Sequence, residues 1–257
     1  MGKDYTIEER VIQRAMETFP LIPELVEFST PVVSFGYPVQ AKVATLGINP
    51  SNNEFQIGNG NKSLLPKSEK RLVDTASLNL NSPVSLNREE AVAVVKGCYS
   101  YFDPEGKPYK WFDKLENHVL RPIGYSYKDR TACHLDLVQW ATDPVWQDAK
   151  MSETSRRLLL DGDKEFLEFQ LKSYDFEYVF LNGGTVVEQV GLLNLFSLEK
   201  VGEVRFNSKG TMSDIVYGKM GDKIFVGWGI NIGYGATYKG GLIDLENWLV
   251  KNLRKLG

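Results

Sequence analysis

The sequence predicts an α/β protein, a three-layer α/β/α sandwich with a central, mostly parallel, four-stranded sheet. Short runs of β-forming residues alternate with longer segments of helical periodicity, the order that places helices on both faces of a parallel sheet. Several of these runs end in small polar turns, as strands do where their carboxyl ends border a ligand site. No Pro/Gly/Ser-rich linker interrupts the 257 residues, so we expect one domain over residues 1–257.

Each element follows from its local pattern. An amphipathic helix over residues 6–19 carries apolar residues at helical spacing and is expected to pack on the domain. Asn87 and Glu90 have the spacing of a capping box and predict a helix start. Further helices are expected at residues 67–80, 87–96, 109–120, 163–173 and 242–253, with another from Thr185 onward. Strands are expected at residues 32–35, 43–46, 133–140, 178–181 and 223–226.

Composition excludes several classes of protein. The two cysteines, Cys98 and Cys133, cannot ligate an iron–sulfur cluster and form no C-x-x-C pair, so we expect reduced thiols, no metal and no cofactor. No segment is long and apolar enough to cross a bilayer, and the N-terminus lacks a secretory signal, which predicts a cytoplasmic protein without a membrane partner. The net charge of -3 argues against a large non-specific nucleic-acid surface, although a local basic face is compatible with it.

The most informative stretch is the turn after the strand at residues 43–46. Gly47 lets the backbone approach a ligand closely, and Pro50 rigidifies the turn. Asn49 is thereby presented as a fixed amide that can both donate and accept hydrogen bonds. Its side chain could hold an attacking water or, as the alternative, serve only the structure of the turn.

Three other strands end in polar residues in the same way, at Asp136, Asn182 and Asn231. The carboxyl ends of parallel strands lie along one edge of a sheet. The three groups and Asn49 could therefore converge there.

With these residues in place, the chain resembles the uracil-DNA glycosylase superfamily. The turn at residues 47–51, GINPS, is similar to the GINPG water-activating motif of the mismatch-directed branch. Residues 178–183, YVFLNG, resemble the third core strand of the family and the turn after it. Residues 231–240, NIGYGATYKG, stand where the family carries HPSPLSVYRG. The strand at residues 133–137 is similar to the one that carries a base-recognising Asn, with Asp136 at that place.

The resemblance implies a monofunctional DNA glycosylase that hydrolyses the N-glycosidic bond of a flipped-out base and leaves an abasic site. It assigns Asn49 to hold the attacking water. It assigns Asn231, where many relatives have a His, to stabilise the departing base through an amide N–H. An Asn can orient water but cannot take its proton efficiently, so we expect slow turnover.

Two substitutions relative to the family bear on the substrate. Ser51 stands where uracil-selective relatives place a Tyr that blocks the pyrimidine 5-position, so the steric gate is removed. Asp136 replaces the Asn that reads uracil, and a carboxylate suits the amino group of cytosine. The expected substrate is therefore a 5-modified cytosine, which fits a role in antiviral defence. Gly47, Ile48 and Pro50 would complete the base-binding turn.

Further side chains are expected to contact double-stranded DNA, although each could instead have an ordinary structural role. Phe55 could stack on the flipped base or close the core, and His134 could share the face of Asp136 or be a satisfied core residue. Tyr234 could wedge into the duplex. Lys62, Arg71 and Lys239 could contact phosphates or be solvated surface residues. We expect a monomer.

Two alternatives stay open. The same fold and chemistry could excise uracil or mismatched thymine in base excision repair. The absence of a His at Asn231, together with a sequence pI of about 5.6, also fits a catalytically inactive nucleic-acid-binding module. A nucleoside hydrolase would act on free nucleosides and show no salt-dependent affinity for DNA.

Overall fold

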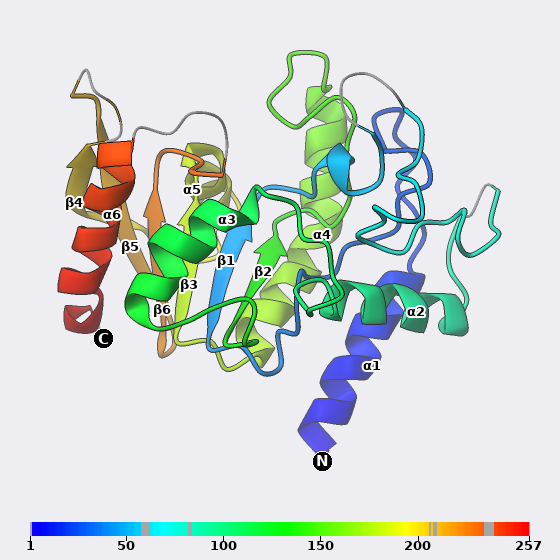
Figure 1. Ribbon diagram of the computed structural model, residues 1–257, viewed down its shortest axis with the longest axis horizontal. Helices are drawn as coiled ribbons and strands as arrows, with labels where there is room; N and C mark the ends of the chain where they lie inside the picture. Colours follow the sequence, from blue (N-terminus) through cyan, green and yellow to red (C-terminus); the bar gives the residue numbers. More distant parts are fainter. Residues whose placement is uncertain are drawn as a thin grey trace. The chain divides into compact units, whose positions relative to one another are not determined.

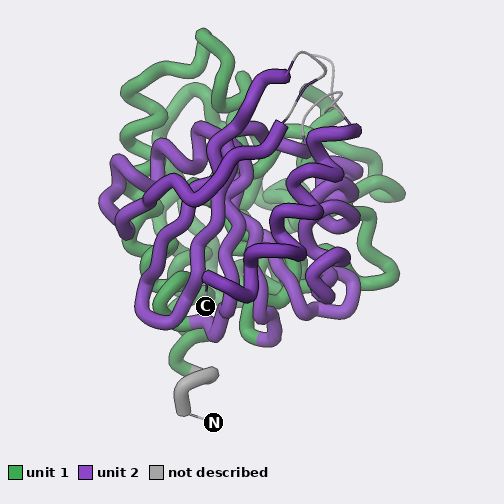
Figure 2. Tube along the Cα trace, turned by 90° about the vertical axis from the view of Figure 1, so that its left-hand side faces the viewer, with its two compact units in different colours: residues 1–39, 48–108, 135–173 green, residues 40–47, 109–134, 174–257 purple. Residues whose placement is uncertain are grey.

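The computed structural model describes residues 2–57, 62–81, 84–205, 207, 210–233 and 239–256, with side chains from Thr6 onward. The chain divides into two compact units, each built from three separate segments (Figure 2). Unit 1 comprises Met1–Val39, Ile48–Pro108 and Leu135–Ser173, and unit 2 comprises Gln40–Gly47, Tyr109–His134 and Tyr174–Gly257. The single domain expected from the sequence stays a prediction.

Unit 2 is built on a mixed sheet of six strands in the order β2-β1-β3-β6-β5-β4 (Figure 1). The last two residues of β2 group with unit 1. Strand β3 pairs in parallel with both β1 and β6, whereas β5 pairs antiparallel with β6 and β4. The strands are β1 Val43–Gly47, β2 Ala132–Asp136, β3 Tyr178–Asn182, β4 Glu199–Arg205, β5 Met212–Met220 and β6 Lys223–Trp228.

The four predicted strands of the central sheet are present and adjacent, as β2-β1-β3-β6. Every residue of β1 and β2 is buried, as expected for strands covered on both faces. The prediction of only four strands was wrong, because the β4–β5 hairpin extends one edge of the sheet. Of the seven residues of β4 only Val204 is buried, so this edge strand lacks the apolar run that marked the others.

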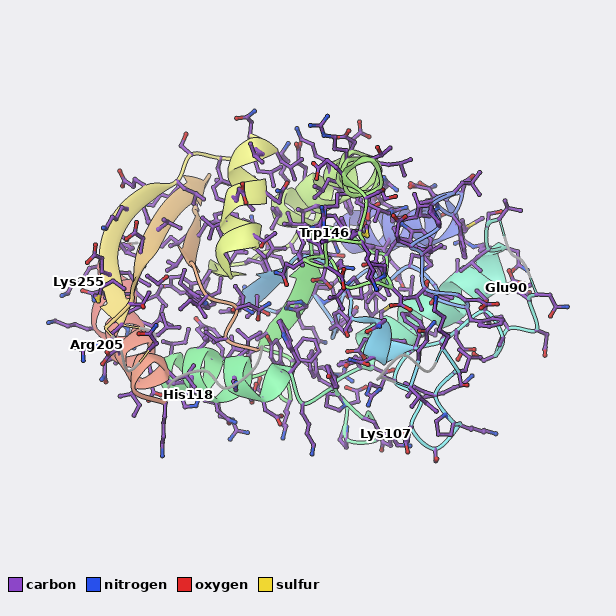
Figure 3. The ribbon with its side chains drawn as sticks, turned by 90° about the horizontal axis from the view of Figure 1, so that it is seen from above. Glu90, Lys107, His118, Trp146, Arg205 and Lys255 are labelled. Carbon is purple, nitrogen blue, oxygen red and sulfur yellow. The ribbon has the colours of Figure 1, made fainter. Side chains whose placement is uncertain are left out.

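Helices lie on both faces of this sheet within unit 2. Helix α5 lies on one face, and α3 and α6 lie on the other, in both views (Figure 1, Figure 3). The predicted helix at residues 109–120 is confirmed as α3 followed by a π-helical turn, η2. The helices are α3 Phe112–Leu115, η2 Glu116–Leu120, η3 Arg121–Ile123, α5 Gly184–Leu192, α6 Lys239–Asn252 and η4 Leu253–Lys255.

Unit 1 is mainly helical, with long irregular connections. Its helices are α1 Gly2–Met16, η1 Asn52–Glu54, α2 Arg88–Tyr99 and α4 Glu153–Ser173. Helix α2 begins with the predicted capping box: Asn87 Oδ1 accepts from Glu90 N at 3.1 Å, and Glu90 Oε2 accepts from Asn87 N at 2.8 Å. Asp163 of α4 forms a buried ion pair with Arg14 of α1. No helix in the described part of the chain is long and apolar enough to span a membrane.

Two predicted elements of unit 1 were wrong. Residues 67–80 form turns, because Ser77 N donates to Asp74 Oδ1 at 2.7 Å and Asp74 N donates to Ser77 Oγ at 3.1 Å. Such bonds between side chain and backbone compete with those of a helix. Residues 32–35 are buried but form no strand of the sheet. Gln170 Nε2 instead donates to the backbone oxygen of Val33 at 2.7 Å.

Candidate functional site

In unit 1, Asn49 is held by two hydrogen bonds that determine which end of its amide is available. Its Nδ2 donates to the backbone oxygen of Trp140 and to Oγ1 of Thr142, both at 3.1 Å. A backbone carbonyl can only accept, so the atom facing Trp140 must be the nitrogen. None of the described residues donates to Asn49 Oδ1, and the side chain is only half-buried. The turn therefore presents a fixed acceptor.

The Asn49 turn takes this form because it runs alongside the chain that follows β2. Val138 N donates to Ile48 O at 3.0 Å, and Ser51 forms a parallel bridge with Thr142. Pro50 is buried in the turn, and its rigidifying role stays a prediction. The acceptor of Asn49 is thus positioned by backbone bonds to a distant segment.

Ser51 and Phe55 flank the short helix η1. Ser51 Oγ accepts from Asn53 N at 3.2 Å and so caps η1. Its side chain remains small and half-buried, and its place beside a base stays a prediction. Phe55 is 2% exposed, the burial expected of the core alternative. Stacking of Phe55 on a base stays a prediction that this burial does not favour.

Two buried carboxyl groups act on each other in unit 1. Asp136 ends β2 and is 5% exposed, and Glu54 ends η1 and is 3% exposed. Tyr101 OH donates to Glu54 Oε2 at 2.8 Å. Burial raises the pKa of Glu54 to about 7; the Tyr101 hydrogen bond and the charge of Arg71 oppose this rise, whereas the charge of Asp136 adds to it. Glu54 is therefore a group that can exchange a proton near neutral pH.

The sequence interpretation missed Glu54. The sequence pattern that could have drawn attention to Glu54 is Ser51-x-x-Glu54, which has the spacing of a capping box. Ser51 does cap η1, but the Glu54 carboxyl is buried and bonded to Tyr101. Arg71, predicted as a phosphate contact, donates through Nη1 to Asn53 O at 2.7 Å and acts electrostatically on Glu54.

The other predicted DNA contacts are spread along the chain. Lys62 is 70% exposed and lies 3.6 Å from the carboxylate of Asp143. Lys239 is exposed at the start of α6. Tyr234 lies outside the described residues. The contacts of these three residues with DNA stay predictions.

In unit 2, Asn182 and Asn231 form a chain of amides in a fixed orientation. Asn182 is fully buried, and its Oδ1 accepts from Trp228 Nε1 at 3.2 Å and from Ile232 N at 3.1 Å. Its Nδ2 is thereby directed to Asn231 Oδ1, at 3.1 Å. Asn231 Oδ1 also accepts from Gly233 N at 3.1 Å, which leaves Asn231 Nδ2 without an acceptor among the described residues. Asn231 therefore presents a donor.

The turn that carries Asn231 depends on glycines. Gly183 has φ +112°, and a Cβ there would lie 3.2 Å from Asn231 Cβ. A Cβ on Gly233 would lie 2.2 Å from Trp111, because the indole ring packs directly on this residue. Trp111 is half-buried beside the turn.

His134 fits the alternative of a satisfied core residue. It is 2% exposed, and its Nδ1 lies 2.7 Å from Thr45 Oγ1, which in turn lies 2.6 Å from Tyr127 OH. Its ring makes edge contacts with Trp111 and Phe112, at centroid distances of 5.3 and 5.1 Å. These contacts do not favour the predicted role in base binding.

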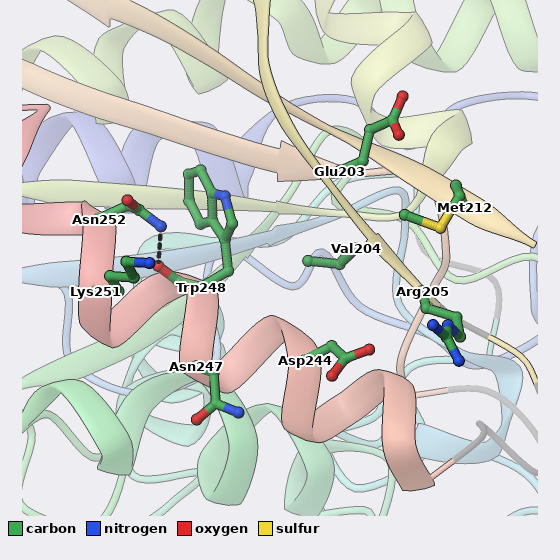
Figure 4. A pocket seen from close by; sticks show the side chains of 9 residues that line it. All are labelled: Glu203, Val204, Arg205, Met212, Asp244, Asn247, Trp248, Lys251 and Asn252. Carbon is green, nitrogen blue, oxygen red and sulfur yellow. Dashed lines mark hydrogen bonds between the residues drawn. The ribbon is translucent and has the colours of Figure 1, made fainter. Parts of the chain in front are cut away.

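A pocket of about 330 Å³ lies between β4 and α6 in unit 2 (Figure 4). Its charged lining residues have both signs, with Glu203 and Asp244 opposed by Arg205 and Lys251. None of the predicted site residues lines it. In the part of the chain that the structure describes, no group of three or more His, Cys, Asp or Glu side chains is placed to hold a metal ion.

No model of a known protein family matches the chain, and no curated protein matches it. The relation to the uracil-DNA glycosylase superfamily is therefore a proposal, which rests on the motifs named above and on the orientation of their side chains.

Proposed function

We propose that the chain is a monofunctional DNA glycosylase of the uracil-DNA glycosylase superfamily, with the three-layer α/β/α sandwich of that superfamily. It hydrolyses the N-glycosidic bond of a flipped-out base in double-stranded DNA and leaves an abasic site. The observation that supports this proposal best is the orientation of Asn49. Its nitrogen is committed to Trp140 O and Thr142 Oγ1, so its oxygen is left to accept a hydrogen bond from a water.

A fixed acceptor suits this reaction because the transition state resembles an oxocarbenium ion. Such a cation is captured by a weak nucleophile, so a positioned water contributes more than a strong base. An amide oxygen in a rigid turn orients the water without needing to take its proton. No Lys stands in the turn from Gly47 to Ser51, so we expect no Schiff-base intermediate.

The role that the resemblance assigns to Asn231 requires a hydrogen-bond donor. Negative charge builds up on the departing base, and an N–H group directed at it lowers the barrier. Asn231 Oδ1 is occupied by Asn182 Nδ2 and Gly233 N, so its Nδ2 is the end that can donate to a ligand. This orientation supports the assignment.

The proposed base is a 5-modified cytosine. Asp136 offers oxygen acceptors, which suit an exocyclic amino group and disfavour the O4 acceptor of uracil. Ser51 leaves room at the pyrimidine 5-position, which a bulkier residue would block. Excision of a modified base would suit antiviral defence, whereas excision of ordinary cytosine would damage the host.

The test uses duplexes that each contain one base: a 5-modified cytosine, cytosine, uracil, or thymine opposite guanine. Abasic sites are counted after incubation with wild type, with Asn49→Ala, and with Asn117→Ala as the matched control at an exposed position of η2. We expect abasic sites from the modified duplex with wild type and Asn117→Ala, and at least about a hundredfold fewer with Asn49→Ala. Equal counts with wild type and Asn49→Ala would remove Asn49 from the mechanism.

The same panel separates the alternatives. Abasic sites only from uracil or mismatched thymine would select a repair enzyme. Tight, salt-dependent binding to duplexes without release of any base would select a binding module.

A further inference from the structure

Glu54 lies at the end of η1, five residues after Asn49, and is turned into unit 1. Its side chain is 3% exposed, and Tyr101 OH donates to Oε2 at 2.8 Å. Arg71 approaches from the segment before α2 and is itself tied to the backbone oxygen of Asn53 at 2.7 Å. Asp136, at the end of β2, acts on Glu54 through its negative charge. Among the described residues, these are the titratable and charged groups that face Glu54.

Opposing influences set the charge of Glu54. Burial disfavours its ionised form and is the largest of them, raising its pKa to about 7. The hydrogen bond from Tyr101 and the positive charge of Arg71 favour the ionised form, whereas the negative charge of Asp136 disfavours it. Near neutral pH the carboxyl group therefore changes between a neutral acid and a carboxylate.

We infer that Glu54 is a positioning residue of the proposed glycosylase. When Glu54 is neutral, Asp136 is the one carboxylate that accepts a hydrogen bond from the amino group of the base. The inference rests on the proposed function. It explains why a buried acid that forms no ion pair with the described residues stands directly after the water-holding turn: Tyr101 holds the carboxyl group in place, and burial favours its neutral form.

The chemistry of bond cleavage shows why a second carboxylate would be harmful. When the C1′–N1 bond breaks, its electron pair passes to the base, which later takes a proton from solvent. The oxygen of the water bonds to C1′, and the proton that it loses passes to solvent. An ionised Glu54 would repel the negative charge that builds up on the base and would also repel Asp136. Cleavage should therefore require neutral Glu54.

The experiment measures single-turnover excision from a 5-modified cytosine duplex between pH 6 and 9. For wild type we expect the rate to fall about tenfold per pH unit above the pKa of Glu54. Glu54→Gln cannot ionise, so its rate should be independent of pH over this range. Tyr101→Phe removes a hydrogen bond that favours the ionised form, so the wild-type profile should move to higher pH.

The outcomes separate this inference from the proposed function. A wild-type rate that does not fall with pH, or a Glu54→Gln rate that falls like that of wild type, would overturn the role of Glu54 and leave the glycosylase standing. A Tyr101→Phe profile at the wild-type position would also count against it. Absence of base release by wild type at every pH would overturn the proposed function itself. A purely structural role for Glu54 would lower the rate without moving the profile.

Discussion

The side-chain nitrogen of Asn49 lies 3.1 Å from the backbone oxygen of Trp140 and donates a hydrogen bond to it. This contact turns the amide so that its oxygen, and not its nitrogen, is available to a ligand. The partner lies 91 positions away along the chain, so the chemistry of the Asn49 turn depends on how unit 1 folds around it.

The first prediction concerns Asn49→Asp. A carboxylate is the better proton acceptor, yet we expect the variant to lose activity and stability. An ionised Asp cannot donate a hydrogen bond to Trp140 O, and one of its carboxylate oxygens would instead face that backbone oxygen. Loss of this bond should lower the free energy of unfolding by about 1–3 kcal/mol, measured by urea denaturation at pH 7.

The matched control for this variant is Asn247→Asp, an exposed position on α6. It introduces the same change of charge, and we expect an effect of within about 0.5 kcal/mol. An Asn49→Asp variant with unchanged stability and increased excision would contradict the orientation that we assign to the amide.

The second prediction separates the two functions of Asn231. In Asn231→Asp, a carboxylate oxygen can still accept from Asn182 Nδ2 and Gly233 N, so the turn should keep its bonds. The donor Nδ2 is lost, and we expect the single-turnover excision rate to fall roughly 10²–10³-fold, as for other donors directed at a developing negative charge. Thermal unfolding should show little change. A large loss of stability with a normal rate would make Asn231 a structural residue only.

The third prediction concerns base choice. Asp136→Asn replaces a group that only accepts hydrogen bonds with one that can also donate them, so the variant should be able to donate a hydrogen bond to the O4 of uracil. We expect the preference between a modified cytosine and uracil to shift toward uracil by roughly 1–3 kcal/mol, from the ratio of the two excision rates. An unchanged ratio would show that Asp136 does not read the base.

The fourth prediction uses stability in place of activity. In the folded protein the pKa of Glu54 is raised to about 7 from its usual value of 4.5, so the folded state holds a proton that the unfolded state releases. Stability from this group is fully present below the unfolded pKa and is lost as pH rises toward 7. Between pH 4 and 8, wild type should lose about 3 kcal/mol relative to Glu54→Gln. Parallel pH curves of the unfolding free energy would contradict the buried neutral carboxyl group.

The fifth prediction tests the contact between Gly233 and Trp111. A Cβ on Gly233 would lie 2.2 Å from the indole ring, so Gly233→Ala must displace the ring or the turn. We expect a loss of about 1–3 kcal/mol in the free energy of unfolding. Gly191→Ala in α5 is the control, because a Cβ there meets nothing within 4 Å and should be neutral or slightly stabilising. Equal effects of the two substitutions would contradict the packing of Trp111 on the turn.

Local patterns were sufficient for the central part of the sheet and for most helices. The runs at residues 43–46, 178–181 and 223–226 are short, apolar and bounded by turns, and all three lie in adjacent strands. The β4–β5 hairpin was missed because an edge strand with one buried residue has no such run. Residues 67–80 have a helical pattern, but Asp74 and Ser77 bond to the backbone as turns.

The candidate site could be predicted only in part. The type of turn at Asn49 follows from Gly47 and Pro50, but the partners that orient its amide, Trp140 and Thr142, are more than 90 positions away. No local pattern records such a contact. The protonation of Glu54 likewise depends on burial, on the hydrogen bond from Tyr101 and on the charges of Arg71 and Asp136, which only the folded chain brings together.

The most direct test of the central claim is to identify the bases that the protein releases. Genomic DNAs that carry different cytosine modifications are incubated with wild type and with Asn49→Ala, and the free bases are determined by mass spectrometry. We expect wild type to release one 5-modified cytosine as the free base, with an equal number of abasic sites, and Asn49→Ala to release almost none. Release of no base from any DNA, or equal release by both proteins, would contradict the central claim.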